Sequence, residues 1–506
     1  MNYLELLRLV APETIVVVTA LAVLAVDLLV MREEPLRNRF RIGAAFAVFG
    51  CLVSAAWLLV MDQTVGSFGG QNGLWSLVGG MFVADPLTRL VKVALLALTL
   101  CTIVISMEGN FTDHVGEYLS LILLATVGMM LLVSSTDLLM IFISLELTSL
   151  SLYILTAFNK RNIRSAEAAL KYFLFGGMSA AFTLFGLSLI YGLSGTTNLN
   201  QIAANLGAGQ SKPDPLLLAA IIMTVIGFGF KIAAVPFHLW APDAYQGAPT
   251  PSAALIASGS KVASFFILAK VMMVAFVHAG GSGAWRHYAA GWLPVLAILA
   301  ALSMLLGNLA AIAQSNVKRL LAYSAIAHAG YALLGLLANN QQGLGSLIYY
   351  VVTYGLTVVG AFGVVTVLEE RVGDARIADF AGLGRREPVL SFCMMIFMLS
   401  LAGIPPLAGF FGKFYLFTAA VGGAKDLGLL WLVVFAIAMS AVSLYYYLQI
   451  LKQIYVVPAP VVEQEIRISV SSRIVLVLLA LSVVMLGCLP NLFLGRLLAS
   501  IQAAGF

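Results

Sequence analysis

Residues 227–249 read GFGFKIAAVPFHLWAPDAYQGAP, and this stretch decides how the rest of the chain is interpreted. It begins as an apolar, membrane-spanning run, yet it holds Lys231 and, five residues later, Pro236. Proline removes a backbone donor and clashes with the carbonyl four positions earlier, here that of Ile232. In lipid, the freed carbonyl needs a partner inside the protein or in a water-filled cavity. A lysine beside a broken helix indicates an internal ion site; the alternative is a kinked helix whose lysine reaches the surface.

The composition places the chain among polytopic membrane proteins. It has 506 residues, of which 61% are hydrophobic and only 10% are charged, and its mean hydropathy is +1.00. The basic residues are scattered through short loops without a basic arm or stripe, so we expect no nucleic acid partner. The cysteines lie in apolar runs without disulfide or metal-ligand spacing, so we interpret them as small hydrophobic residues and expect no metal site. They are Cys51, Cys101, Cys393 and Cys488.

Hydropathy predicts an all-α fold of about fourteen transmembrane helices. Each apolar run is near or above the roughly 20 residues that a helix needs to cross a bilayer. The first run continues to Met31 after a segment without net positive charge, so we interpret it as an uncleaved span. The predicted spans are 12–31, 42–61, 86–106, 117–135, 137–158, 166–193, 215–240, 251–278, 291–312, 319–338, 343–368, 388–420, 427–456 and 472–498.

Lysine and arginine in the loops predict the orientation of these spans, because they are enriched on the cytoplasmic side. If the N-terminus is outside, the inner loops hold most of them: Arg32, Arg37, Arg39, Arg41, Lys160, Arg161, Arg164, Lys318, Arg319, Arg371, Arg376, Arg385, Arg386, Lys452, Arg467 and Arg473. The outer side holds only Arg8, Lys212, Arg286, Lys425 and Arg496. We therefore expect a cell inner membrane protein with both termini on the periplasmic, outer side.

Charged residues inside the spans are candidates for carrying protons. Glu146 lies about ten residues into its span, near the midplane, where a carboxylate is costly unless a lysine on another helix offsets it. A structural ion pair is the alternative. Lys261 lies at a similar depth, and Ser258 and Ser264 would share one helical face with it, which suggests a wet interior path.

Three further groups each have two interpretations. Lys171 follows Glu167 by four residues, the favourable order for a helical ion pair, so a local pair and a relay role both stay open. His238 follows the break, and His328 lies within LLAYSAIAHAGYALL. Imidazole can give and take protons near neutral pH, but it is also often a hydrogen-bonded core residue.

Three basic residues lie near the ends of predicted spans. We expect their aliphatic stems to run along the apolar helix and their charged ends to reach the membrane surface. They are Arg89, Lys92 and Lys270.

The twelfth predicted span contains a second break, the Gly-Ile-Pro-Pro sequence at 403–406, which frees the carbonyls of Leu401 and Ala402. Lys413 follows it. The two interrupted spans are five apart, so they run in opposite directions, which is typical of an inverted repeat with a path at each break. We therefore expect three N-terminal helices in 1–116, two five-helix repeats in 117–280 and 281–457, and a C-terminal helix in 458–506.

Four segments make the chain resemble the antiporter-like membrane subunits of respiratory complex I, which are related to subunits of cation/proton antiporters. They are GFKIAAVPFHLWAPDAYQGAP (229–249), GIPPLAGFFGKF (403–414), VKRLLAYSAIAHAGY (317–331) and the glutamate of SLEL (144–147). The resemblance covers spans four to thirteen. The chain looks most like subunit N, the counterpart of mitochondrial chain 2, because Lys413 stands where the L and M subunits are expected to be acidic. A lysine there also occurs among antiporter subunits.

The resemblance implies proton translocation while partner subunits pass electrons from NADH to quinone. It implies that Glu146 and Lys231 form a charge pair in a first half-channel. It makes Lys261 the central relay and Lys413 the terminal site of a second half-channel. Lys171 matches a lysine of the family's sixth span, His328 fits the connecting axis, and His238 is a further possible relay.

The sequence shows no redox motif of its own: no GxGxxG after a strand, no Walker loop and no cysteine cluster for iron–sulfur. We expect no cofactor in this chain, and NADH, FMN and iron–sulfur clusters in the other membrane and hydrophilic subunits of complex I. Two alternatives stay open. One is a subunit of a stand-alone or Mrp-type cation/proton antiporter, and the other is a structural subunit that does not pump.

Overall fold

The computed structural model describes residues 10–68, 76–77, 80–207, 214–285, 287–423, 427–458 and 468–505. Some of the residues used to predict the orientation lie outside these ranges: Arg8, Lys212, Arg286, Lys425 and Arg467. The described chain is almost entirely helical. Its named strands, β1 (Ser76–Leu77) and β2 (Phe82–Val83), form one short antiparallel pair. The all-α prediction is confirmed.

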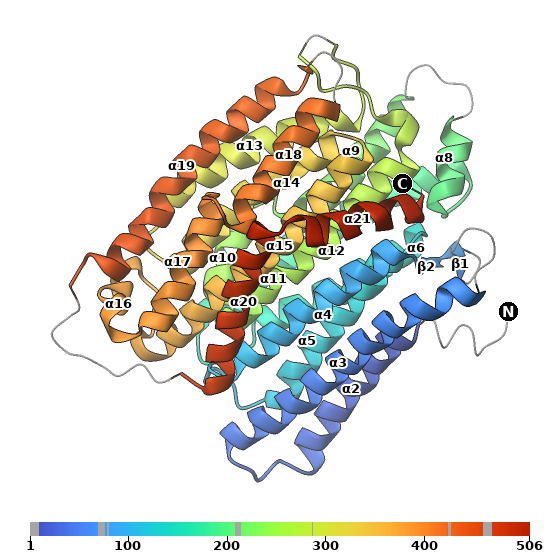
Figure 1. Ribbon diagram of the computed structural model, residues 1–506. Helices are drawn as coiled ribbons and strands as arrows, with labels where there is room; N and C mark the ends of the chain where they lie inside the picture. The colour runs from blue at the N-terminus through green and yellow to red at the C-terminus, as the bar shows by residue number, and fades with distance from the viewer. Residues whose placement is uncertain are drawn as a thin grey trace.

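Thirteen helical segments in the described residues are long and apolar enough to cross a membrane. They run side by side as one bundle (Figure 1). They are α2 (Ala11–Leu29), α3 (Leu36–Phe68), α4 (Pro86–Ser106), α5 (Val115–Ser134), α6 (Leu138–Thr156), α7 (Ile163–Ser194), α9 (Pro215–Ile232), α11 and α12 with the π-helix η2 (Thr250–Ala275), α13 (Trp292–Ile312), α14 (Val317–Leu337), α15 (Gln341–Val372), α19 (Leu430–Tyr455) and α20 (Val470–Cys488). The predicted span 388–420 is divided between α17 (Pro388–Ala402) and α18 (Ala408–Gly423), which accounts for the predicted fourteenth crossing.

The last predicted span, 472–498, is wrong at its C-terminal end. α20 ends at Cys488, and α21 (Asn491–Ala504) is a separate helix that begins after Pro490. α21 packs against α15 and α4, and Figure 1 shows it lying across them. Proline disfavours a helical conformation of the residue before it, which explains why the apolar run does not continue as one straight helix.

The loops gather at two opposite ends of the bundle, as helices of alternating direction require. At one end, Arg161 Nη2 lies 2.6 Å from Asp113 Oδ2, joining the loops on either side of α5 and α6. At the other end, Leu138 N donates to Thr197 O at 2.9 Å. Figure 1 shows α16 (Leu383–Arg386) at the first end and α8 (Leu199–Gly207) at the second. We call these the α16 end and the α8 end.

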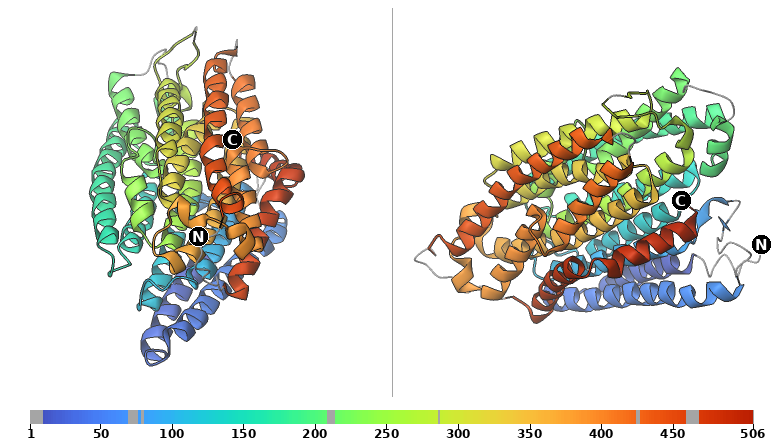
Figure 2. Two further views of the ribbon diagram at one scale, coloured as in Figure 1. Left: turned by 90° about the vertical axis from the view of Figure 1, so that its left-hand side faces the viewer. Right: turned by 45° about the horizontal axis from the view of Figure 1, so that its top comes forward.

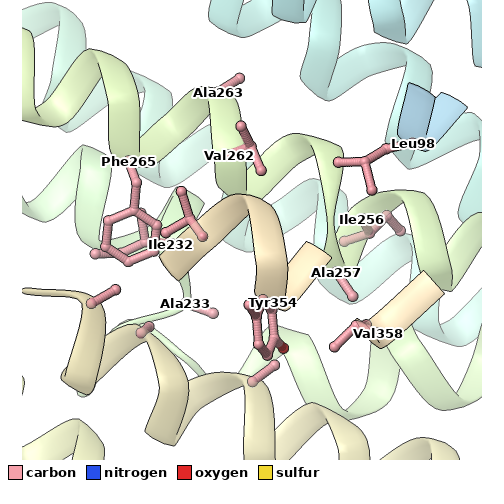
Figure 3. Close-up of a cluster of buried hydrophobic side chains, with 14 of the residues drawn as sticks. Leu98, Ile232, Ala233, Ile256, Ala257, Val262, Ala263, Phe265, Tyr354 and Val358 are labelled. Atoms are coloured by element: carbon pink, nitrogen blue, oxygen red, sulfur yellow. The ribbon is translucent and has the colours of Figure 1, made fainter. Parts of the chain in front are cut away.

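The most enclosed helices lie in the middle of the bundle. Every residue of the most apolar window of Thr250–Ala275 is buried, and 94% of the corresponding windows of α14 and α15 are. In contrast, α2 and α3 lie along one edge of the bundle, in blue in Figure 2. Figure 3 shows the centre, where the end of α9 meets α11, α12 and α15 around Tyr354. Any buried polar group here must find its partners within the protein.

Both predicted breaks are present, and they share a backbone pattern. α9 stops at Ile232, where Ala233 takes a left-handed conformation (φ 59°), and α17 stops before Gly403 (φ 87°). A cis proline follows each: Pro236 in the first break and Pro406 in the second. The first broken span resumes as α10 (Trp240–Gly247).

A third interruption was not predicted. Ser258, with φ −115° and ψ −83°, separates α11 (Thr250–Ala257) from α12 (Gly259–Lys270). The predicted single polar face of Ser258, Lys261 and Ser264 on one continuous helix is therefore wrong at Ser258. α12 is followed directly by η2 (Val271–Ala275), and such π-helical turns are frequent at functional sites.

Candidate functional site

The first predicted pair is brought together between α6 and α9. Lys231 Nζ lies 3.9 Å from Glu146 Oε1 and donates a hydrogen bond to Ser149 Oγ. The Lys231 side chain is 8% exposed and the Glu146 side chain 28%. Lys231 is in the last turn of α9, where the helix dipole favours a cation. Ser149 was missed, although its spacing of three residues from Glu146 places both on one helical face.

Two carbonyls in the last turn of α9 accept hydrogen bonds from residues of the first break and of α10. Ala234 N donates to Gly229 O at 2.8 Å, and the indole Nε1 of Trp240 donates to Phe230 O at 3.1 Å. The first residue of α10 is thus tied back to the last turn of α9. This arrangement holds Lys231 at a fixed helix end instead of on a loose kink.

Lys261 lies in the core with few polar partners. It is 3% exposed, and its Nζ donates to Ala325 O of α14 at 2.6 Å. The ammonium also lies 5.9 Å from the ring centre of Tyr354 on α15. A lysine ammonium has three donors, so among the described residues one hydrogen bond leaves the group only partly satisfied.

His328 is the centre of a buried cluster of tyrosines. Its Nδ1 lies 2.6 Å from the hydroxyl of Tyr350, and its Nε2 lies 3.1 Å from the hydroxyl of Tyr447. His328 is 4% exposed. Its ring centre is 4.8 Å from that of Tyr354 and 5.7 Å from that of Tyr331. A hydroxyl on each ring nitrogen can accept or donate a proton, whichever tautomer the imidazole adopts.

Lys413 is bonded to the two carbonyls that the second break frees, as the structural interpretation of this lysine predicts. Its Nζ donates to Leu401 O at 3.0 Å, to Ala402 O at 3.1 Å and to Ser440 Oγ of α19 at 2.9 Å. It also lies 5.1 Å from the ring centre of Tyr331. The three donors of this ammonium therefore have three acceptors, in contrast with Lys261.

Lys261, His328 and Lys413 form one buried line across the molecule. Tyr354 touches both Lys261 and His328, and Tyr331 touches both His328 and Lys413. The line connects α12, α15, α14 and α18. It can pass a proton only if water or side-chain motion closes the gaps, because aromatic contacts of 5 to 6 Å are not hydrogen bonds.

Side chains that were not predicted from the sequence support this line. Asn308 of α13 donates to the Tyr331 hydroxyl at 3.0 Å and accepts from the Tyr446 hydroxyl at 2.9 Å. Their helical spacing could have predicted some of them, because polar side chains three or four residues apart share a face. The missed residues are Asn308, Ser324, Tyr331, Tyr350, Tyr354, Tyr446 and Tyr447.

Lys171 lies apart from the buried line, at the α16 end. Its Nζ is 2.7 Å from Glu167 Oε1 and 2.9 Å from Asp243 Oδ2 of α10, so the predicted local ion pair is confirmed. Arg319 also reaches Asp243, at 2.6 Å. Asp243 thus pairs with one basic residue from α7 and one from α14. His238 lies in the turn between α9 and α10, partly buried.

The expectation that three basic residues reach the membrane surface is wrong. Lys92 is 4% exposed, and its Nζ lies 2.6 Å from Glu13 Oε1 of α2. Lys270 is also 4% exposed and donates to Val133 O at 3.4 Å. Arg89 is 9% exposed. Glu13 of α2 offsets the charge of Lys92, and a carbonyl of α5 accepts from Lys270.

The described residues hold no group of three or more His, Cys, Asp or Glu side chains that could bind a metal ion.

Comparison with known proteins gives a consistent picture. Residues 135–440 match the family model described as NADH:quinone oxidoreductase/Mrp antiporter, TM. The chain is 52% identical to the NADH-quinone oxidoreductase subunit N 2 of Acidobacterium capsulatum, over 97% of this chain and 98% of that one. It is 37% identical to the NADH-quinone oxidoreductase subunit N of Trichlorobacter lovleyi, over 96% of this chain and 95% of that one.

The fold is similar to that of a chain in respiratory complex I from Thermus thermophilus with bound aureothin. The TM-score is 0.76 at 32% identity, and the match covers 96% of this chain and 99% of that one. A chain of the Mrp complex from Dietzia has a TM-score of 0.81 at 22% identity, covering 98% of this chain and 96% of that one. At that identity the second likeness shows the fold alone.

Proposed function

Because this chain belongs to the NADH-quinone oxidoreductase subunit N family, we propose that its buried lysines, Glu146 and His328 carry protons across the membrane. The chain is a multi-pass, proton-pumping membrane subunit of a bacterial complex I, and it acts with the other subunits of that complex. As part of that translocase it couples pumping to the transfer of electrons from NADH to quinone.

The observation that carries the proposal is the buried line from Lys261 through His328 to Lys413. Charged side chains are costly inside a membrane, so a line of them through the most enclosed helices needs a functional reason. The line also ends at Lys413, beside the second break. Lys261 lies next to a third interruption, where a small backbone movement would change its hydrogen bond to Ala325 O.

The first half-channel is proposed to start at Glu146 and Lys231. At 3.9 Å their charges interact without a direct hydrogen bond, and Ser149 holds the ammonium. A shift of either side chain would alter the proton affinity of the other. Lys171 and His238 flank the same broken span, and we propose that they connect this pair to the α16 end.

We propose that both termini face the periplasmic side, so that the α16 end is cytoplasmic. The arginine-rich loops support this, because Arg161, Arg385 and Arg386 all lie at the α16 end. We also propose the inverted repeats 117–280 and 281–457, with 1–116 and 458–506 outside them. Their support is that a left-handed residue ends the first helix at each break and that a lysine lies beside each break.

We propose that NADH, FMN and iron–sulfur clusters all lie in partner subunits. The alternative role, a subunit of an Mrp-type antiporter, is supported only by a fold likeness at 22% identity, whereas the N-subunit relatives reach 52%. Purification of the complex with its redox subunits separates the two roles.

The proposal is tested by Lys261→Met in the intact complex, with Lys452→Met as the matched control. Lys452 is exposed near the end of α19, so the same chemical change there should be neutral. NADH-driven proton uptake by inside-out membrane vesicles should fall about ten-fold or more in Lys261→Met, since a positioned proton-transfer group typically contributes at least that much. Electron transfer from NADH to an artificial acceptor should persist. Normal proton uptake in the assembled variant would refute the role of Lys261.

A further inference from the structure

A cleft of about 1120 Å³ opens at the α16 end, away from the buried line. It lies between the start of α3 and the start of α20, with the end of α4 between them (Figure 1). The end of α15 contributes Arg371. These elements lie at the border between a membrane-spanning bundle and its loops, so a ligand here would meet both the apolar and the polar zones.

Three arginines line the polar part of the cleft. Arg37 and Arg41 are four residues apart on α3 and therefore point to the same side. Arg371 faces them from α15. Arg39, between the first two, points elsewhere and forms a two-pronged pair with Asp27, at 2.8 and 2.6 Å.

The positive charges of Arg37 and Arg41 have no acidic partner among the described residues. Among the described residues, neither Arg37 nor Arg41 forms an ion pair, and both are exposed. The acidic residue in the lining, Glu108, already accepts hydrogen bonds from the backbone N and the hydroxyl of Ser469. Arg37 and Arg41 are therefore available to an external anion.

The other wall of the cleft is apolar. Along α3 it continues from Phe40 through Ala44 and Ala45 to Val48, and Val104 and Ile468 face it from α4 and the segment before α20. Arg37 and Val48 are eleven residues apart, which is roughly 16 Å along a helix. A free phosphate or a nucleotide would use the arginines but not this wall.

We propose that the cleft binds an anionic phospholipid, with its phosphate among Arg37, Arg41 and Arg371 and an acyl chain along the α3 wall. Guanidinium groups match phosphate geometry and form strong, charge-assisted hydrogen bonds. Basic pockets between transmembrane helices at the membrane surface are suited to anionic headgroups. The proposal does not depend on the proton path, because none of its residues belongs to that path.

The test uses the whole purified complex with Arg37→Gln/Arg41→Gln, and Arg385→Gln as the control. Arg385 is an exposed arginine at the same end of the bundle but outside the cleft. Each complex is depleted of lipid, incubated with vesicles of phosphatidylglycerol or of phosphatidylcholine, and its retained lipid is counted by mass spectrometry. Phosphatidylglycerol retention at this site should weaken about ten-fold or more in the double variant, because two charge-assisted hydrogen bonds are lost. Retention should be unchanged in the control.

A second variant, Ala45→Trp, fills the apolar wall without changing charge. It should also reduce phosphatidylglycerol retention, and it covers the case in which the arginine variant fails to assemble. Equal retention of phosphatidylglycerol by all complexes, or equal retention of phosphatidylcholine and phosphatidylglycerol by the unmodified one, would overturn the proposal. So would loss of a neighbouring subunit from the arginine variant with lipid retention unchanged, because the cleft would then be a protein contact.

Discussion

Lys261 and Lys413 are both buried lysines, yet their ammonium groups are held differently. Among the described residues, Lys413 has three oxygen acceptors, whereas Lys261 has one carbonyl and the face of Tyr354. An ammonium with three fixed acceptors resembles a structural cation, and one with a single acceptor depends on water or on movement of its neighbours. The contacts of Lys413 thus fit a structural lysine as well as a gated proton site. The two roles differ in whether the ammonium must release its proton.

The pair of Glu146 and Lys231 gives a prediction at the scale of single residues. Two charges about 4 Å apart attract by about 4 kcal/mol at the effective dielectric typical of proteins, so removal of one leaves the other uncompensated. Glu146→Gln and Lys231→Met should each reduce proton uptake and coupled quinone reduction about ten-fold or more. Transfer of electrons from NADH to an artificial acceptor should continue.

The double substitution should be no more impaired than the worse single one, because the two residues act as a unit. Proton uptake in inside-out vesicles measures all three complexes, with their assembly checked by gel filtration. If both single variants assemble and pump normally, the two residues do not form a functional pair.

At the scale of elements, the broken helices are what place the lysines. Lys231 occupies the last turn before the first break, and Lys413 bonds back to the two carbonyls that the second break frees. Gly403 makes the second contact possible. A Cβ at that position would lie 3.1 Å from Lys413 Cδ and 3.2 Å from its Nζ, and the backbone is left-handed there.

Gly403→Ala should therefore both strain the backbone and displace Lys413. Gly373→Ala is the matched control, because Gly373 is also left-handed (φ 80°) but has nothing within 4 Å of the added Cβ. Each substitution should cost about 1–2 kcal/mol of conformational strain, measurable as a lower melting temperature of the complex. Only Gly403→Ala should also lower proton uptake. Equal effects of the two substitutions on pumping would show that the close contact with Lys413 has no functional role.

At the scale of the whole molecule, the sequence predicted what depends on local chemistry. Long apolar runs predicted the spans, and Pro236 and Pro406 marked two breaks. The interruption at Ser258 has no proline to signal it. Partners that come from distant helices could not be predicted either. His328 and Tyr447, for example, are 119 residues apart and meet only in the folded bundle. The enclosure of Lys92 by α2 has the same cause.

The orientation of the bundle is a prediction for the whole molecule. In intact cells, cysteines introduced by Arg37→Cys and Arg386→Cys should resist an impermeant thiol reagent, because the α16 end is proposed to be cytoplasmic. Gln201→Cys, exposed on α8 at the opposite end, should react. The experiment needs a Cys488→Ser background, because Cys488 is exposed. Ready labelling at the two arginine positions without labelling on α8 would reverse the orientation.

The most direct test of the proton path is the number of protons pumped per electron by the reconstituted complex carrying Lys413→Arg. Arginine keeps the positive charge and the donors to Leu401 and Ala402, but it does not readily release its proton. Assembly must be confirmed first, because guanidinium is bulkier than the ammonium it replaces. We predict an assembled complex that transfers electrons but pumps fewer protons per electron than the unmodified one. An assembled Lys413→Arg complex with the full ratio would contradict a path that requires this lysine to give up its proton.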